Sequence, residues 1–316
     1  MPIQPLLLSL SRFAAILSVC VAIAHAGDTA LPTGNAVIRG EYAGADIVIT
    51  TTERLAGAIH SLTWNGQEYI DSHDHGRQLQ SASNLDTGRR MYGETFNPTE
   101  AGSRSDGAGE TSTSQLLHLV ARDNCLQTTS RMAFWLRPGE ESGGHPARNT
   151  TTLSDHLLTK RVTIGYRDMP NVIQYDVTFG IPVSEHHTLA QFEAVTGYMP
   201  ASFKRFQTID LSSGELHSLT DGPGEQSRPV IFSTASGLHA MGIYSPQQPS
   251  SGFENAGYGR WRFASQKVVK WNCVFRIRRQ EGVSPGDYSF RSYVVVGTLS
   301  DVAATIMKLG GKSSDD

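Results

Sequence analysis

From residue 40 onward the chain repeats one pattern: a short run of β-branched and aromatic residues that ends at a cluster of Gly, Pro, Asn, Asp or Ser. Such runs are typical of β-strands, and the clusters between them are typical of turns. Apolar residues at helical spacing occur only at 299–309, near the end of the chain. The sequence therefore predicts an all-β protein. The expected strands are 45–51, 58–64, 160–166, 172–179, 229–234, 268–277 and 288–297.

The clearest hairpin signal is Asn65-Gly66, which lies between Trp64 and Tyr69. Both central residues of the favoured two-residue turn need positive φ, which asparagine and glycine adopt at little cost. The sequence contains no repeat of fixed period and no stretch that resembles a linker between domains. These features favour a single large antiparallel β-sandwich.

Residues 1–26 are expected to be a signal peptide that is removed from the mature protein. Arg12 precedes an apolar run at 13–24, which is shorter than the roughly twenty residues that a membrane helix needs. Ala24-His25-Ala26 is a small-residue cleavage pattern, so the mature chain would begin at Gly27. We therefore expect a secreted or periplasmic protein.

Removal of residues 1–26 leaves 26 Lys+Arg against 30 Asp+Glu, a formal charge of −4. This balance gives no electrostatic reason to expect nucleic acid or an anionic membrane as a partner. The remaining length is sufficient for one β-sandwich domain, expected over 27–309, with a solvated tail over 310–316. Cys125 and Cys273 would either form a disulfide or remain separate buried thiols.

Ionisable residues crowd into 73–102, although the chain as a whole is only 18% charged. If residues 72–80 are extended, alternation places His73, His75 and Arg77 on one face. Histidine changes charge near neutral pH, and arginine binds carboxylates or sugar hydroxyls through its planar fork. This face is therefore suited to a polar pocket, and an exposed polar sheet edge is the alternative.

The second part of this region, 93–102, is expected to be an ordered loop. Pro98 fixes φ and biases Asn97 away from the helical conformation. Glu94, Asn97 and Glu100 follow one another at three-residue spacing. Two neighbouring carboxylates can have their pKa values pushed apart, which yields one acid and one base. Turn and capping roles are the alternative for both glutamates.

A metal site is a second interpretation of the same region. On a strand, His73 and His75 would present two nitrogens to one ion, with a third ligand from elsewhere such as Glu94 or Glu100. The sequence favours a polar site without a metal, and no cofactor is expected.

Later segments add five candidate side chains. Alternation places His156 and Lys160 on the same face of one strand. Glu193 lies among apolar neighbours, where a carboxylate needs a partner or a raised pKa. Tyr198 follows five residues later, and His239 lies in an apolar run where a core histidine with its nitrogens satisfied is the default. The sequence has no Gly-x-Ser-x-Gly elbow, phosphate loop or Cys-x-x-Cys motif, which leaves sugar chemistry as the favoured interpretation.

With these residues in view, the chain resembles the galactose mutarotase-like group, the aldose 1-epimerase type of β-supersandwich. The resemblance is carried by 57–70, which is similar to that group's early hairpin of Ser-Leu followed by Gly-x-Glu, and by Asp74-His75-Gly76-Arg77. It implies a sugar site without a metal, in which a central histidine and a late glutamate exchange protons with the sugar. Glu185-His186-His187 and Glu193 lie in the corresponding central region, and paired histidines in a loop are typically solvated.

The leading hypothesis is an exported carbohydrate-active enzyme that acts on a glycan or small sugar by general acid/base chemistry. Glycosidase, polysaccharide lyase and aldose epimerase types remain open. The alternative is a non-catalytic secreted carbohydrate-binding module. The expected catalytic residues are His75, Glu94, Glu100 and Glu193, and the expected substrate-binding residues are Arg77, Asn97, His156, Lys160, Tyr198 and His239.

Overall fold

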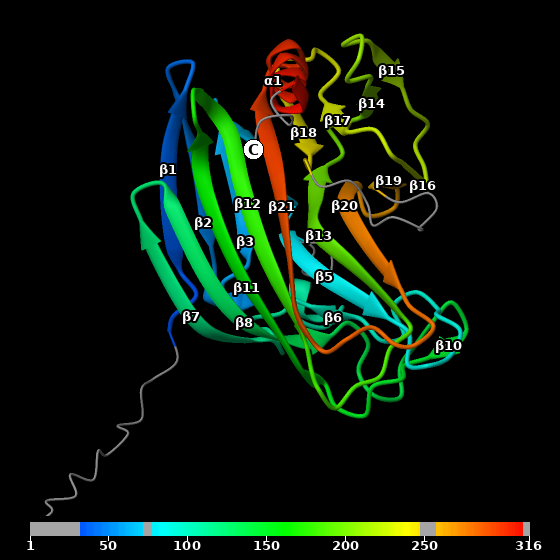
Figure 1. Cartoon of the computed structure of the whole chain (residues 1–316). Coiled ribbons are helices and arrows are strands. Elements are labelled where there is room, and N and C mark those ends of the chain that lie inside the picture. The colour runs from blue at the N-terminus through cyan, green and yellow to red at the C-terminus, as the bar shows by residue number, and fades with distance from the viewer. Residues whose placement is uncertain (1–31, 72–77, 247–256, 312–316) are drawn as a thin grey trace, which may run out of the picture. The chain divides into compact units, whose positions relative to one another are not determined.

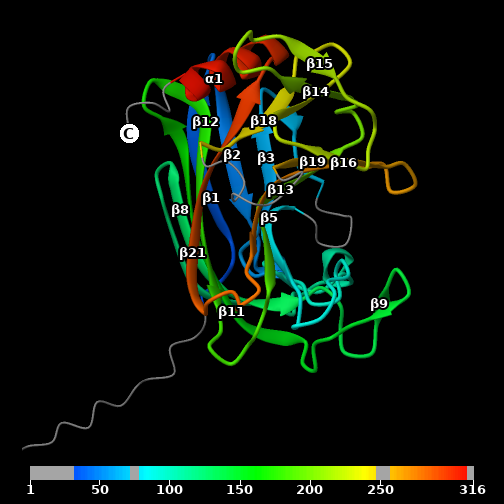
Figure 2. The same ribbon diagram turned by 45° about the vertical axis from the view of Figure 1, so that its right-hand side comes forward.

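The computed structural model describes residues 32–71, 78–246 and 257–311. The predicted signal peptide therefore lies outside the described residues. Within the described ranges the chain forms two layers of antiparallel strands, as Figures 1 and 2 show, which confirms the prediction of an all-β sandwich.

The first layer consists, in spatial order, of β7 (Gln115–Arg122), β8 (Cys125–Phe134), β11 (Leu153–Tyr166), β12 (Met169–Ile181), β21 (Gly286–Gly297), β18 (Ala240–Tyr244), β17 (Val230–Ser233), β14 (Arg205–Ile209) and β15 (Leu216–Ser218). The second layer consists of β1 (Ala36–Tyr42), β2 (Ala45–Thr51), β3 (Ile59–Trp64), β5 (Leu79–Leu85), β13 (Leu189–Pro200), β20 (Val268–Arg278), β19 (Tyr258–Phe263) and β16 (Gly224–Gln226).

Short elements connect and extend the layers. The strand β6 (Pro98–Thr99) pairs with both β5 and β8 and so joins the two layers, and β4 (Gln67–Glu68) completes the hairpin of β3. A separate hairpin is formed by β9 (Glu141–Ser142) and β10 (His145–Pro146). Two 3-10 turns occur at Glu53–Leu55 and Asp106–Ala108.

The main core lies between the two layers. Alternate residues of β11 and β13, such as Leu158, Val162 and Phe192, are buried in it because successive side chains of a strand point to opposite faces. The opposite face of β13 is thus left for polar residues. Asn65 and Gly66 have φ of 48° and 73°, as the predicted hairpin turn requires. All seven predicted strands are present, with ends that differ by a few residues.

The predicted helix at 299–309 is present as α1 (Leu299–Gly311), which takes up the first two residues of the predicted tail, and 312–316 lie outside the described residues. Its buried side chains form a second core with β17, β18 and β21. Gly242 permits this close approach, because a Cβ there would lie 2.6 Å from the Ile306 side chain. Among the described residues, no helix is both long and apolar enough to cross a membrane.

The possible disulfide between Cys125 and Cys273 is not formed, and both cysteines are free. The two residues belong to strands of different layers, β8 and β20, and each sulfur has its own hydroxyl neighbour, Thr163 and Ser292 respectively. Burial raises the pKa of the Cys273 thiol to about 12. This thiol is therefore un-ionised at neutral pH and is a packing residue rather than a nucleophile.

Candidate functional site

Three neighbouring strands of the second layer carry polar residues on the face opposite the core. The strand β13 lies between β5 and β20, and Gln191 is paired across the sheet with Asn84 on one side and Arg276 on the other. Because residues that alternate along a strand share a face, these side chains extend over adjacent strands as one surface. We call it the polar face: Gln80, Ala82, Asn84, Gln191, Glu193, Thr196, Tyr198, Lys270, Asn272 and Arg276.

A β-bulge interrupts this alternation at the centre of β13. The pairing of β13 with β20 shifts between Glu193 and Val195, and its pairing with β5 shifts in the same region. The extra residue brings Glu193 and Thr196, three positions apart, to the same side, where the Thr196 hydroxyl donates to Glu193 Oε2 at 2.7 Å. Bulges that re-aim a side chain are frequent beside active sites.

Glu193 is held as an anion by its neighbours. Lys270 Nζ donates to Glu193 Oε2 at 3.2 Å, and only 16% of the Glu193 side chain is exposed. Burial alone would raise the pKa of Glu193, but the charge of Lys270 and the hydrogen bonds from Thr196, Asn272 and Lys270 outweigh burial and lower this pKa. Glu193 is therefore ionised at neutral pH and able to accept a proton or attack an electrophilic carbon.

A cavity of about 60 Å³ lies over Glu193. Glu94 reaches the cavity from the loop that precedes β6. The hydroxyl of Ser142, on β9, donates to Glu94 Oε2 at 2.7 Å. The backbone of Glu94 has φ of 67°, a conformation that L-residues rarely adopt and that is frequent at functional sites. The remaining lining residues are Gln80, Ala82, Asn84, Asn97, Thr99, Trp135, Thr196, Tyr198 and Lys270.

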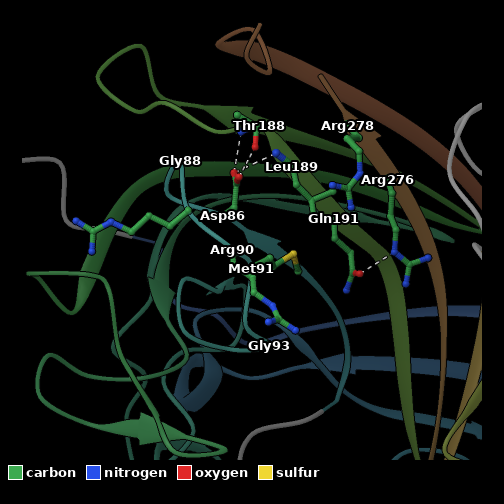
Figure 3. Close-up of a pocket in the computed structure, with 11 residues that line it drawn as sticks. Asp86, Gly88, Arg90, Met91, Gly93, Thr188, Leu189, Gln191, Arg276 and Arg278 are labelled. Atoms are coloured by element: carbon green, nitrogen blue, oxygen red, sulfur yellow. Dashed lines mark hydrogen bonds between the residues drawn. The ribbon is translucent and has the colours of Figure 1, made fainter. Parts of the chain in front are cut away.

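A larger cavity of about 650 Å³ covers the next part of β13 and is shown in Figure 3. Four arginines line it: Arg89 and Arg90 from the loop after β5, and Arg276 and Arg278 from β20. Arg276 is held in place, because its Nε donates to Gln191 Oε1 at 2.8 Å and its guanidinium forms an ion pair with Glu225. The cavity is therefore a basic compartment beside the carboxylates.

A third cavity of about 490 Å³ shares Arg89 with the basic compartment. Its wall contains Tyr92 stacked on His145, with ring centroids 3.5 Å apart and an angle of 18° between the planes. Arg148 lies 5.5 Å from the centre of the Tyr92 ring. Aromatic faces and arginine forks together can bind a ring that carries hydroxyl or acidic groups.

A separate cluster is formed by His156, Glu185 and His187. The Nε2 atoms of both histidines contact Glu185 Oε2, at 2.7 Å for His156 and 2.8 Å for His187. Burial would raise the pKa of Glu185, but hydrogen bonds and positive charge from the two histidines outweigh burial and lower this pKa to about 2. His187 is 1% exposed, so the prediction that the paired histidines of this loop are solvated is wrong for His187.

Four predicted site residues come together at the small cavity: Glu94, Asn97, Glu193 and Tyr198. Asn97 also donates from Nδ2 to the Ser83 carbonyl and so fixes the loop against β5. The predicted His75 and Arg77, like the His73 of the metal interpretation, lie outside the described residues.

Glu100 and Lys160 do not belong to this cavity, which corrects the prediction that Glu94 and Glu100 form a catalytic pair. Both side chains are 0% exposed and form an ion pair between the layers. The reason is β6: Pro98 and Thr99 pair with β8 and β5, and the chain then turns Glu100 beneath Ser81, whose backbone N–H donates to Glu100 Oε2 at 3.1 Å. Lys160 is therefore unavailable to a substrate.

The other two predicted substrate-binding residues also lie elsewhere. His156 does share the inward face of β11 with Lys160, as predicted, but it contacts Glu185 rather than a cavity. The ring of His239 packs edge-on against Trp64 and Tyr69, at centroid distances of 5.8 and 6.4 Å. His239 is half-buried, and its buried Nε2 has no hydrogen-bond partner among the described residues, so the predicted core histidine with both nitrogens satisfied is not what the structure shows.

Sequence reasoning missed the contribution of β20. The strand carries Lys270, Asn272, Arg276 and Arg278 at even positions, between buried Trp271, Cys273 and Phe275, and only the buried Val274 interrupts the series. This alternation is the signal that could have placed Lys270 beside Glu193. Arg89 and Arg90, by contrast, lie in a loop and had no periodic signal.

No family model matches the chain, and no curated protein matches it. Solved structures do resemble it in the arrangement of strands. A suspected aldose 1-epimerase from Escherichia coli K12 is 9% identical, with a TM-score of 0.46, over 84% of this chain and 100% of the other. An α-mannosidase from Enterococcus faecalis V583 is 10% identical, with a TM-score of 0.48, over 87% of this chain and 31% of the other. A heparan sulfate lyase from Pedobacter heparinus is 10% identical, with a TM-score of 0.41, over 84% of this chain and 35% of the other.

These three structures are described as an epimerase, a mannosidase and a lyase. At identities near a tenth and TM-scores below 0.5, no activity and no residue role is taken from them. The chemistry of this chain has to be argued from its own polar face.

Proposed function

We propose that the protein is a carbohydrate-active enzyme that acts on a glycan at the polar face by general acid/base chemistry. The observation that carries the proposal is the small cavity, in which Glu94 and Glu193 come together with the rings of Tyr198 and Trp135. Two carboxylates in different surroundings provide an acid and a base, and aromatic rings provide a surface for the apolar face of a sugar.

The surroundings of the two carboxylates suggest their roles. Glu193 is ionised and held by Lys270 and Thr196, which suits a base or nucleophile. Glu94 accepts one hydrogen bond from Ser142 and is aimed by a strained loop, which suits the acid. A cavity of about 60 Å³ has the volume of roughly two waters, so it admits a hydroxyl or a ring edge, with the rest of the sugar in the larger cavity.

The larger cavity favours a substrate that carries acidic groups. Arg89, Arg90, Arg276 and Arg278 all line it, and arginine binds carboxylate or sulfate groups through paired N–H donors. The four arginines outnumber Asp86, the acidic residue of the same lining, although the chain from residue 27 carries a formal charge of −4. Together with the predicted signal peptide, this leads us to propose a secreted or periplasmic enzyme that acts on an acidic glycan.

The test is incubation of the mature chain with a panel of neutral and acidic oligosaccharides. Unsaturated products that absorb in the ultraviolet would indicate a lyase, new reducing ends without such absorbance a hydrolase, and accelerated anomer exchange alone an epimerase. Turnover of an acidic glycan that is lost in Glu193→Gln supports the proposal. Turnover that is unchanged in Glu193→Gln contradicts the assigned site.

The double variant Arg89→Ala/Arg90→Ala should weaken binding of an acidic oligosaccharide about tenfold, because each arginine contributes a charge-assisted hydrogen bond or a screened attraction. Titration calorimetry at two salt concentrations measures this, and the effect should shrink at high salt. Arg122→Ala, at an exposed position on β7, is the matched control. Equal binding of neutral and acidic glycans by the native chain would rule out the acidic substrate.

A non-catalytic glycan-binding module is the second candidate. It is favoured by the full set of partners around Glu193, since Thr196, Asn272 and Lys270 together leave little capacity for proton transfer. This alternative predicts glycan binding without any product from the same panel, and binding that survives Glu193→Gln.

A further inference from the structure

We propose that His156, Glu185 and His187 form a binding site for one zinc ion. His156 lies on β11, whereas Glu185 and His187 lie in the turn between β12 and β13. The three ligand atoms, one from each residue, all lie within 4.8 Å of one another. This site is distinct from the polar face and does not depend on the proposed glycan chemistry.

The geometry requires only small shifts to hold zinc. Four-coordinate zinc has Zn–N and Zn–O distances of about 2.0–2.2 Å, so its ligand atoms lie about 3.3–3.5 Å apart. Here Glu185 Oε2 lies 2.7 Å from His156 Nε2 and 2.8 Å from His187 Nε2. An ion between these atoms would move them apart by less than about 1 Å, and water would take the fourth position.

The contacts of His187 leave its Nε2 as the atom that faces Glu185 and the proposed metal position. Its Nδ1 contacts the backbone carbonyl oxygen of Asp86, and its Nε2 contacts Glu185 Oε2. A carbonyl oxygen can only accept, so the Nδ1 of His187 carries the proton and its Nε2 is the atom turned toward Glu185. With zinc bound, Nδ1–H donates to Asp86 while the lone pair of Nε2 binds the metal. A ligating histidine that donates its other N–H to a backbone carbonyl is the usual outer-shell arrangement.

Asp86, whose carbonyl oxygen contacts His187, is itself held in place by hydrogen bonds. Asp86 Oδ1 accepts hydrogen bonds from the backbone N–H groups of Thr188 at 2.8 Å and Leu189 at 3.0 Å. The ring of Phe96 lies 5.5 Å from the His187 ring and limits access of water from that side. Outer-shell groups of this kind orient a ligand before the metal binds.

The donor set favours zinc over the common alkaline-earth ions. Two imidazole nitrogens and one carboxylate oxygen match the ligand set of catalytic zinc sites, whereas calcium and magnesium prefer oxygen donors alone. The side chains of His156 and Glu185 are 1% and 19% exposed, so the site is enclosed but can be reached through Glu185. The zinc would join β11 to the turn before β13 and, through Asp86, to the loop that carries Arg89 and Arg90.

The experiment uses the mature chain, stripped with a chelator and then titrated with zinc. We expect one zinc ion per chain, and a weakening of at least about 100-fold in His156→Ala and in His187→Ala, since loss of an outer-shell group alone costs 10–100-fold. His118→Ala, at an exposed position on β7, is the control and should bind as the native chain does. Circular dichroism shows whether each variant remains folded.

A second measurement needs no variant. Cobalt added to the stripped native chain should give the visible absorption of a tetrahedral site, and stoichiometric zinc should remove this absorption. No zinc bound by the native chain, or affinity that is unchanged in both histidine variants, would overturn the proposal. In that case the cluster is a hydrogen-bonded group of Glu185 and the two histidines.

Discussion

Replacement of Lys160 by methionine should lower the free energy of unfolding by about 3–5 kcal/mol, as measured by urea denaturation of a chain that begins at Gly27. Lys160 and Glu100 are both 0% exposed and paired, so the substitution leaves the Glu100 carboxylate in the interior without its cation. The remaining contacts of Glu100 cannot replace the lysine. One oxygen accepts a hydrogen bond from the Ser81 backbone N–H at 3.1 Å, and this bond carries no full positive charge.

Tyr175, which lies beside the ion pair, cannot replace Lys160 as a hydrogen-bond donor to Glu100. Burial first, and the Glu100 charge second, raise the pKa of Tyr175 well above its usual value, so its hydroxyl remains protonated. The Ser81 hydroxyl donates to the Ala194 carbonyl at 2.7 Å, which makes Tyr175 the donor in its 3.0 Å hydrogen bond to Ser81. The proton of Tyr175 is thus already used.

Two controls separate the buried charge from loss of packing. The double variant Lys160→Met/Glu100→Gln should recover most of the lost free energy of unfolding, because no net charge is then buried. Arg39→Met removes an exposed ion pair with Asp46, in which both side chains are more than 60% exposed, and should cost less than about 1 kcal/mol. A cost for Lys160→Met no larger than that for Arg39→Met would contradict the interior position of the pair.

Glu193→Gln should lower the turnover of an acidic glycan by about 10²–10⁴-fold, the contribution typical of a positioned acid or base. Glutamine keeps the size of the side chain and can still bond to Thr196, so binding should change little. Turnover and affinity are to be measured separately on the same oligosaccharide. Glu215→Gln, at an exposed position after β14, is the matched control and should retain full turnover.

The lowered pKa of Glu193 predicts how turnover changes as the pH falls. The pKa of Glu193 is lowered, so this base stays ionised as the pH falls and is lost only when the pH passes below the usual glutamate range. The acid limb of the rate profile should therefore lie below that range. Lys270→Met removes the main attractive charge and should move this limb to higher pH, whereas an unmoved limb would show that another group titrates.

Much of the fold was predictable because its strands follow local rules. The runs at 45–51 and 268–277 are β-branched or apolar, and the turn at Asn65-Gly66 requires residues that adopt positive φ. The site was predictable only in part. Glu193 attracted notice as a carboxylate among apolar residues, but its partner Lys270 is 77 residues away and meets it only through the register of β13 with β20.

Two errors of the sequence prediction have the same physical cause, since tertiary pairing overrides spacing along the chain. Glu94 and Glu100 are close in sequence, yet β6 lies between them and turns Glu100 into the core. His156 and Glu185 are distant in sequence, yet the β11–β12 hairpin returns the chain so that Leu157 pairs with Gly180, which brings Glu185 back to His156. Neither pairing has a signal in local composition.

The central claim is that the polar face around Glu193 binds and transforms a glycan. Its most direct test is a crystal structure of Glu193→Gln with an acidic oligosaccharide, because the variant should bind the sugar without turning it over. We predict a ring edge of the sugar in the small cavity beside Tyr198 and Trp135, with the rest of the ring and its acidic groups in the larger cavity, within hydrogen-bond distance of Arg89, Arg90 or Arg278. A sugar bound elsewhere on the chain, with the polar face empty, would contradict the account.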